Sequence, residues 1–268
     1  MNGLNEEAIL SLGSPLARVV EVHDALASTQ DRARELARSG SPHGTLVVAG
    51  VQTGGRGRLR RAWGSPEGGL WMSLVLRPGL EAAAAPRVTQ TAAVAVAKAL
   101  RELGANVGIK WPNDLLAEPG GRKICGILAE SSLGAACPGE ASYVDHALLG
   151  VGLNANLDPE DLGVTDREVA TLRSELGHDE DPLDIVHLVL RNLHAELERI
   201  HDFAVVLDDW RALSLTLGRH VSVRRSGEVL EGLAVEITAE GALLLETEDG
   251  LVELHEGEVE HLRQSQTP

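Results

Sequence analysis

Residues 45–63 read TLVVAGVQTGGRGRLRRAW, so an apolar, β-branched run leads directly into a loop of glycines and arginines. The run at 45–52 predicts a buried strand. A dinucleotide-binding turn would need glycine where Arg60 stands and a helix after it, whereas residues 64–69 are turn-like and precede another strand-like run. No Gly-Lys-Ser/Thr follows either, so the stretch also excludes a P-loop.

The loop suits an anionic ligand, because its glycines let backbone N–H groups approach an anion and its arginines can grip phosphate or carboxylate. No acidic residue lies between Gln52 and Pro66, although the formal net charge of the chain is −16. That balance argues against a surface built for nucleic acid or anionic membrane, and it makes a cationic cluster informative. We predict a mobile cationic flap over a polyphosphate, with a solvated basic loop as the alternative. The cluster consists of Arg56, Arg58, Arg60 and Arg61.

Only three of the 24 basic residues are lysines, and two of them lie in polar loops. Lys110 opens the run Lys-Trp-Pro-Asn-Asp at 110–114, and Lys123 precedes an apolar strand-like run. A compact ammonium can meet a single oxyanion in a tight pocket, whereas arginine presents a planar fork. Both lysines are therefore candidate catalytic residues, with chance placement as the alternative.

The run at 110–114 predicts a turn at the end of a strand, because Pro112 restricts its own backbone and that of the residue before it. Asp114 on such a turn could hold Mg²⁺ together with a phosphate. The alternative is a turn whose Asn113 and Asp114 satisfy local backbone groups. Trp63 and Trp111 are two of six aromatic residues in the chain and both border the cationic motifs. They are expected to form pocket walls, unless they belong to the core.

Strand-like and helix-like runs alternate over the first four fifths of the chain and give way to short β runs from residue 218 onward. Strands are predicted at 16–22, 45–52, 69–77, 107–111, 123–130 and 143–153. Helices are predicted at 28–38, 86–103 and 182–203, with a short one around Trp210. Four further strands, at 220–224, 230–237, 242–247 and 250–254, predict a small β-barrel. Ser28 and Asp31 have the spacing of a capping box at the first helix.

Composition bounds the class of protein. The hydrophobic content of 43% supports a substantial core, and no run approaches the ~20 apolar residues of a membrane span. The first 16 residues lack the pattern of a secretion signal, so the cytoplasm is the expected compartment. Cys125 and Cys137 are too few for a disulfide framework or a zinc site, and Cys125 is expected to be a core residue.

Together, five ordered motifs resemble those of biotin protein ligases. They are Ser28-Thr29-Gln30, Gly55-Arg56-Gly57-Arg58 with Trp63, Lys110 to Asp114, Arg122 to Glu130, and Gly150 to Asn156. The match in order and spacing runs from about residue 16 to 160, and the C-terminal β runs match too. The resemblance implies an α+β fold in which a mixed sheet flanked by helices, similar to class II synthetases and biotin–lipoate ligases, carries a small SH3-like β-barrel. The expected domains are 1–214, catalytic, and 215–268.

The resemblance implies an enzyme that activates biotin with MgATP as biotinyl-5'-AMP and transfers it to a lysine of a biotin carboxyl carrier protein. ATP and biotin would be substrates, Mg²⁺ an activator, and no tightly bound prosthetic group is expected. Only about 15 residues precede the first strand, so the ligase-only type without an N-terminal DNA-binding domain is expected. No DNA or membrane partner is expected, and a homodimer stays open.

By match to the family motifs, Lys123, Arg58, Lys110 and Asp114 would be catalytic, with Asp114 at the metal beside the ATP phosphates. The expected biotin-binding residues are Ser28, Thr29, Gln30, Gln52, Gly55, Arg56, Gly57, Arg58, Trp63, Lys123 and Gly126. The expected ATP-binding residues are Arg58, Lys110, Trp111, Asn113, Asp114, Lys123 and Asn154.

Two departures from the family pattern stand out. Relatives usually carry glycine where Arg60 stands, so the flap is expected to order differently. Several place an aromatic over the adenine, where this chain has Val-Ala-Thr-Leu at 169–172. Two alternatives remain: a lipoate- or octanoate-transferring enzyme of the same fold, and a non-catalytic biotin-binding module. The polar set Ser28, Thr29 and Gln52 favours biotin, because a dithiolane ring offers nothing to hydrogen-bond.

Overall fold

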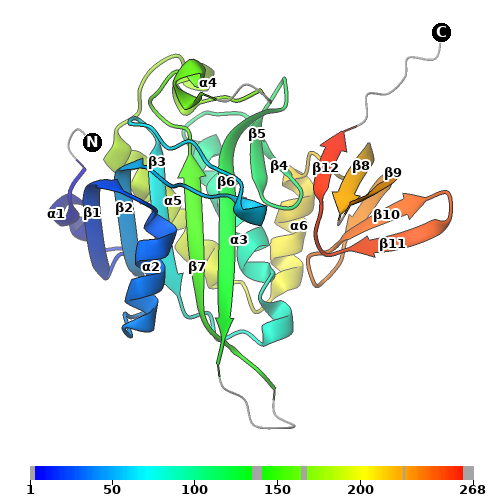
Figure 1. Ribbon diagram of the computed structural model, residues 1–268, viewed down its shortest axis with the longest axis horizontal. Helices are drawn as coiled ribbons and strands as arrows, with labels where there is room; N and C mark the ends of the chain where they lie inside the picture. The colour runs from blue at the N-terminus through cyan, green and yellow to red at the C-terminus, as the bar shows by residue number, and fades with distance from the viewer. Residues whose placement is uncertain (1–3, 135–140, 164–167, 226, 262–268) are drawn as a thin grey trace.

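The computed structural model describes residues 4–134, 141–163, 168–225 and 227–261. Its main sheet has seven strands in the order β1-β2-β3-β7-β6-β5-β4, of which β1 and β2 are parallel and all other neighbours antiparallel (Figure 1). The strands are β1 Val19–Leu26, β2 Thr45–Gln52, β3 Leu70–Leu76, β4 Val107–Lys110, β5 Asp114–Ala117, β6 Arg122–Leu133 and β7 Val144–Leu153. The predicted mixed sheet is confirmed.

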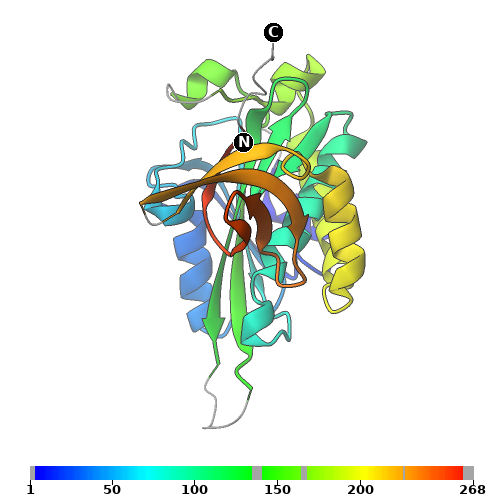
Figure 2. The ribbon, with the colours of Figure 1, turned by 90° about the vertical axis from the view of Figure 1, so that its right-hand side faces the viewer.

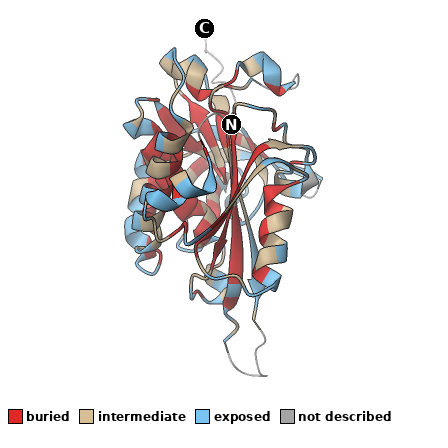
Figure 3. Ribbon diagram, turned by 90° about the vertical axis from the view of Figure 1, so that its left-hand side faces the viewer, coloured by how far each residue is buried: buried red, intermediate tan, exposed pale blue. Residues whose placement is uncertain are grey.

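Helices cover both faces of this sheet, and alternation along β2 explains how. Val47 faces Ala33 and Ala37 of α2, whereas Leu46 and Val48 face the cluster that contains α3. Because successive side chains point to opposite faces, a strand covered on both sides must be apolar throughout, as β2 is. Figures 2 and 3 show α2 and α6 on opposite sides of the sheet, and buried strands enclosed by helices with exposed outer faces.

The helices are α1 Glu6–Ser11, α2 Thr29–Arg38, α3 Arg87–Glu102, α4 Leu172–Leu176, α5 Pro182–Leu197 and α6 Phe203–Leu213, with short 3₁₀ turns η1 Arg58–Arg60, η2 Ala82–Ala84 and η3 Pro159–Leu162. Every long helix expected from the sequence is present, whereas α1 and α4 were not expected. The first strand begins at Val19 and runs to Leu26, later than predicted, because Leu16 and Ala17 are buried ahead of it in a turn.

A second, antiparallel sheet of five strands follows in the order β11-β10-β9-β8-β12. Its strands are β8 His220–Arg225, β9 Glu228–Ile237, β10 Leu243–Thr247, β11 Gly250–Leu254 and β12 Glu258–His261. The expected small β domain is confirmed as a separate sheet. Among the residues that the structure describes, β11 and β12 do not pair, so the sheet is open rather than a closed barrel. The reason is that β12 pairs with β8 and leaves β11 at the opposite edge.

The two sheets meet along a hydrogen-bonded seam. The carbonyl oxygen of Gly241 accepts hydrogen bonds from Gln90 Nε2 of α3, at 3.1 Å, and from Trp111 Nε1, at 3.2 Å. Leu215 N donates to the Ile109 carbonyl at 2.8 Å. The seam therefore attaches the second sheet to the segment that carries Lys110. The predicted boundary near residue 214 lies at this seam and stays a prediction.

Cys125 is buried in β6, which confirms it as a core residue, and burial raises the pKa of its thiol to about 12. Cys137 lies outside the described residues. No helix in the described part of the chain is both long and apolar enough to cross a bilayer.

Candidate functional site

A cavity of about 1100 Å³ opens where the flap, the 110–114 turn, the start of β6 and the edge of the second sheet converge. All residues predicted for biotin or ATP line it except Gly55 and Asn154. The cavity thus unites motifs as far apart in the sequence as Ser28 and Gly152. The role of each residue toward a ligand stays a prediction.

The flap is a tight antiparallel loop that begins where β2 ends. Gly55 O accepts from Trp63 N, and Gly57 N donates to Arg61 O, both at 2.9 Å. A Cβ on Gly55 would lie 2.6 Å from the Trp63 carbonyl oxygen, so only glycine fits at this hinge. Leu59 takes the positive φ of the turn, 54°, and its side chain is 74% exposed. The chain therefore reverses at Leu59, without a glycine in the left-handed region.

Two half-buried cations face the cavity without a carboxylate partner among the described residues. Arg58 Nη1 donates to Asn113 Oδ1 at 3.3 Å and to the Gly257 carbonyl at 3.4 Å, but neither acceptor carries a charge. Lys110 forms no salt bridge with any described residue. Burial lowers the pKa of both side chains. Removing a cation from water without pairing it is unfavourable, so the site favours an anionic ligand here.

Lys123 is the third cation of the cavity and is held by Asp114. Its Nζ lies 2.6 Å from Asp114 Oδ1 and 4.9 Å from the centroid of the Trp63 ring. The lysine side chain is only 13% exposed. This contact places the β6 lysine between the acidic end of the 110–114 turn and the indole of the flap. It is therefore fixed in direction, which suits a single developing oxyanion.

Trp63 packs on a floor made of glycine. Gly126 of β6 and Gly152 of β7 are register partners. A Cβ would lie 3.2 Å from the indole at Gly126 and 2.7 Å from it at Gly152. Trp63 Nε1 is buried and has no hydrogen-bond partner among the described residues. An unpartnered buried donor is costly, so a ligand acceptor is expected beside it.

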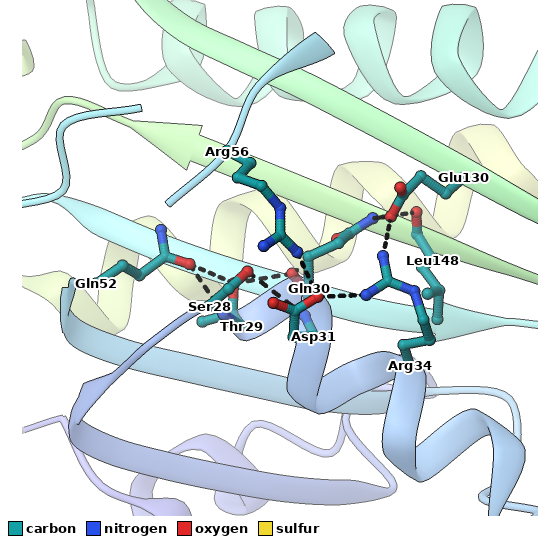
Figure 4. Close-up of polar contacts among 10 residues, drawn as sticks. Ser28, Thr29, Gln30, Asp31, Arg34, Gln52, Arg56, Glu130 and Leu148 are labelled. Atoms are coloured by element: carbon teal, nitrogen blue, oxygen red, sulfur yellow. Dashed lines mark hydrogen bonds and ion pairs between the residues drawn. The ribbon is translucent and has the colours of Figure 1, made fainter. Parts of the chain in front are cut away.

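The opposite end of the cavity presents uncharged polar side chains, beside the ion pair of Arg56 and Asp31. Thr29 donates to Gln52 Oε1 through both its backbone N–H, at 2.9 Å, and its Oγ1, at 3.1 Å. The Thr29 and Ser73 hydroxyls are 2.9 Å apart, and Ser73 Oγ donates to Gln30 Oε1 at 3.0 Å. Figure 4 shows Thr29, Gln30 and Gln52 beside Asp31, Arg34, Arg56 and Glu130. Such a row of alternating donors and acceptors suits a neutral ligand that has both.

Ser28 caps α2 as its spacing to Asp31 predicts, whereas Trp111 and Asn154 have contacts that the sequence did not indicate. Ser28 is the N-cap of α2, and its Oγ accepts from Asp31 N at 3.4 Å. Trp111 is 1% exposed and donates across the seam to Gly241, so its side chain is mostly structural. Asn154 is buried outside the cavity, with Nδ2 donating to Ala170 O at 2.9 Å. Its Oδ1 lacks a partner in the described part of the chain.

Sequence reasoning missed several cavity residues. Ser73 is one, although a lone hydroxyl in the apolar strand β3 was an available signal. Arg224, Gly257 and Glu258 of the second sheet are others, and nothing local marks them. Glu258 Oε2 accepts from Arg61 Nη2 at 2.7 Å, so the second sheet holds the flap directly.

The fit of Mg²⁺ rests on Asp114. No group of three or more metal-ligating side chains occurs within the described ranges. Asp114 offers one carboxylate, already paired with Lys123, and Mg²⁺ binds through one or two carboxylates when substrate phosphates supply further oxygens. The residues therefore fit Mg²⁺ as part of a metal–nucleotide complex, and not as an ion bound by protein alone.

Residues 22–154 match the model of the biotin/lipoate A/B protein ligase family, and residues 216–262 match the biotin protein ligase C-terminal domain. The chain is 37% identical over 243 residues to the bifunctional ligase/repressor BirA of Bacillus subtilis, covering 89% of this chain and 72% of that protein. It is 30% identical to the biotin–[acetyl-CoA-carboxylase] ligase of Mycobacterium tuberculosis, covering 96% and 94%. The biotin protein ligase of Aquifex aeolicus in complex with biotin and ATP superposes with a TM-score of 0.74 at 29% identity, over 92% and 99%.

Proposed function

We propose that this chain, which belongs to the biotin/lipoate A/B protein ligase family, is a biotin protein ligase: it activates biotin with ATP as biotinyl-5'-AMP and passes the biotinyl group to a lysine of an acceptor protein. In the first step a biotin carboxylate oxygen bonds to the α-phosphorus, the α–β phosphoanhydride bond breaks, and pyrophosphate leaves. In the second, the uncharged lysine amine bonds to the acyl carbon, the acyl–oxygen bond breaks, AMP leaves, and the amine proton passes to solvent.

The observation that carries this proposal is the division of one cavity into a cationic and a neutral polar part. Bringing the carboxylate and the α-phosphate to about 4 Å costs about 4 kcal/mol at an effective dielectric constant near 20. Lys123, Arg58 and Lys110 provide fixed positive charge where these two anions would meet. We infer that Lys123 contacts both reacting groups and that Arg58 and Lys110 contact the phosphates.

The neutral polar part suits the ureido ring of biotin, which has N–H donors and a carbonyl acceptor. Thr29, Gln52 and Ser73 present hydroxyl and amide groups that can serve both. An octanoyl chain or dithiolane ring has no donors and acceptors to match these groups, which would then bond only to one another. This favours biotin over lipoate or octanoate.

Mg²⁺ bound with ATP would neutralise phosphate charge, and Asp114 is the residue that would hold it. Asp114 also orients the Lys123 side chain through their ion pair, so it positions that ammonium before a metal–nucleotide complex binds. The family match assigns the adenine to Asn154, which here is buried outside the cavity with an Oδ1 that lacks a partner among the described residues. These assignments extend the family motifs residue by residue.

The acceptor is inferred to be a carboxyl carrier domain, since relatives are named biotin–[acetyl-CoA-carboxylase] ligases. A homodimer, the lack of a DNA partner and the cytoplasmic location stay predictions.

Exchange of labelled pyrophosphate into ATP tests the activation step. Purified protein is expected to exchange in the presence of biotin, and much less with lipoate or octanoate at the same concentration. Exchange that ignores biotin, or that lipoate supports equally, would contradict the proposal. Incorporation of labelled biotin into a carrier domain, and its loss when the acceptor lysine is replaced, tests the second step.

A further inference from the structure

Asp31 belongs to none of the predicted site motifs, yet its carboxylate binds the flap. Oδ1 accepts hydrogen bonds from Arg56 of the flap and from Arg34 one turn further along α2. In a capping box this carboxylate would turn back toward the N-cap residue. Here only half of that motif forms, because Ser28 Oγ accepts from Asp31 N while the Asp31 side chain points to the flap (Figure 4).

A second ion pair holds Asp31 and Arg34 in place. Arg34 Nη2 lies 2.5 Å from Glu130 Oε2 of β6, and Gln30 Nε2 donates to the same oxygen at 3.0 Å. Positive and negative groups thus alternate from the flap to the main sheet, in the order Arg56, Asp31, Arg34, Glu130. Every member of this row except Arg56 lies on a regular element, either α2 or β6. The row therefore ties a loop to a rigid support.

Arg56 forms part of the wall between two cavities. It lines the main cavity and also a side cavity of about 560 Å³. The side cavity shares Gln30, Arg58 and Leu128 with the main one, whereas Arg34 and Glu130 line the side cavity alone. Since Gly57 and Leu59 also line both, the flap separates the two spaces, and Arg56 is the part of the flap that Asp31 holds.

We propose that Asp31 is a positioning residue that acts through Arg56 to hold the flap across the biotin end of the cavity. This rests on the proposed function. The other flap contacts, Arg58 to Asn113 and Arg61 to Glu258, lie toward the phosphate end and the second sheet. Asp31 supplies the matching contact at the other end, and its effect is to keep the adenylate bound and shielded from water until the acceptor arrives.

The competing explanation is that Asp31 only stabilises α2, as an acidic residue in the first turn with an i,i+3 arginine partner. Asp208→Asn is a matched control, because Asp208 pairs with Arg211 at i,i+3 on α6, away from the cavity. Asp31→Asn removes the charge, and Asp31→Glu keeps it. All three variants need thermal unfolding measurements beside the activity assays.

The readout is AMP release from ATP and biotin without acceptor protein, which reports escape and hydrolysis of the adenylate. Asp31→Asn is expected to raise this release about fivefold, equivalent to about 1 kcal/mol in flap closure, and to raise the KM for biotin with little change in kcat for transfer. Asp31→Glu should restore most of the retention. Asp208→Asn should leave release at the wild-type rate.

A double-mutant cycle tests whether Asp31 acts through Arg56. In an Arg56→Met background, Asp31→Asn is expected to add no further release. Additive effects, or wild-type retention in Asp31→Asn, would overturn the inference. Biotin-dependent exchange by the wild-type protein is measured in parallel. If the wild type does not exchange, the proposed function itself fails, and if it exchanges while Asp31→Asn retains adenylate normally, only the role of Asp31 fails.

Discussion

Replacing Lys123 with methionine removes one positive charge while keeping an unbranched side chain of similar length. Without the Lys123 ammonium, the repulsion between carboxylate and α-phosphate, about 4 kcal/mol at about 4 Å, loses its nearest compensation. Since about 1.4 kcal/mol corresponds to a factor of ten, adenylate formation is expected to fall about a thousandfold. The other cavity cations, Arg58 and Lys110, do not replace it, because neither forms the ion pair with Asp114 that fixes the place of the Lys123 ammonium.

The fold should survive this change. Asp114 would lose its 2.6 Å partner but would remain in the field of Lys110 and Arg58. A destabilisation of about 1–2 kcal/mol is therefore expected, less than for an isolated buried carboxylate.

Biotin-dependent pyrophosphate exchange and thermal unfolding measure the two effects separately. Lys98→Met is a suitable control, because Lys98 binds Glu196 and Asp209 in an ion cluster of α3, α5 and α6 outside the cavity. It should lower the melting temperature and leave exchange nearly unchanged in folded protein. Exchange by Lys123→Met within about threefold of wild type would refute the electrostatic reasoning, since threefold is only ~0.7 kcal/mol.

Gly152→Ala places a Cβ 2.7 Å from Trp63 Nε1, so the indole must move; a weaker affinity for biotin in calorimetry is expected, by about tenfold. Gly241→Ala combines a φ of +81° with a contact at 2.4 Å to the Gln90 amide, and denaturant unfolding should show a loss of about 2 kcal/mol or more. The Arg32 hydrogen bond lowers the pKa of Glu21 from 4.5 to about 2. A depressed folded-state pKa means that this pair stabilises fully above pH 4.5 and loses its contribution as the pH falls toward 2, which unfolding curves at several pH values would show.

Each of these has a control on the same chain. Gly134→Ala meets its nearest atom only at 3.6 Å and should bind biotin normally. Gly177→Ala has a similar φ of +80° but open space, so an equal loss there would show that backbone strain, not the seam, dominates at Gly241. Glu21→Gln should flatten the acid limb of the stability profile; an unchanged limb would assign it to other carboxylates.

Much of the site could be predicted because its residues sit in short motifs at the ends of strands. The glycines and arginines of the flap, and the lysines at 110 and 123, carry their chemistry in their residue types. What could not be predicted is the set of contacts that each residue makes once folded. Trp111 was predicted to be a pocket wall or a core residue; it lines the cavity, is 1% exposed and donates a hydrogen bond across the seam to Gly241.

Strand and helix positions followed from periodicity, which depends on neighbours in the chain, and the order of motifs was enough to indicate the family. By contrast, the contact between Glu258 of β12 and Arg61 of the flap joins residues almost two hundred positions apart. The open edge of the second sheet, the wall between the two cavities and the pairing of Arg56 with Asp31 are likewise products of packing. A side chain's type limits what it can bind, but its partner is decided by which elements the core brings together, and no local pattern records that.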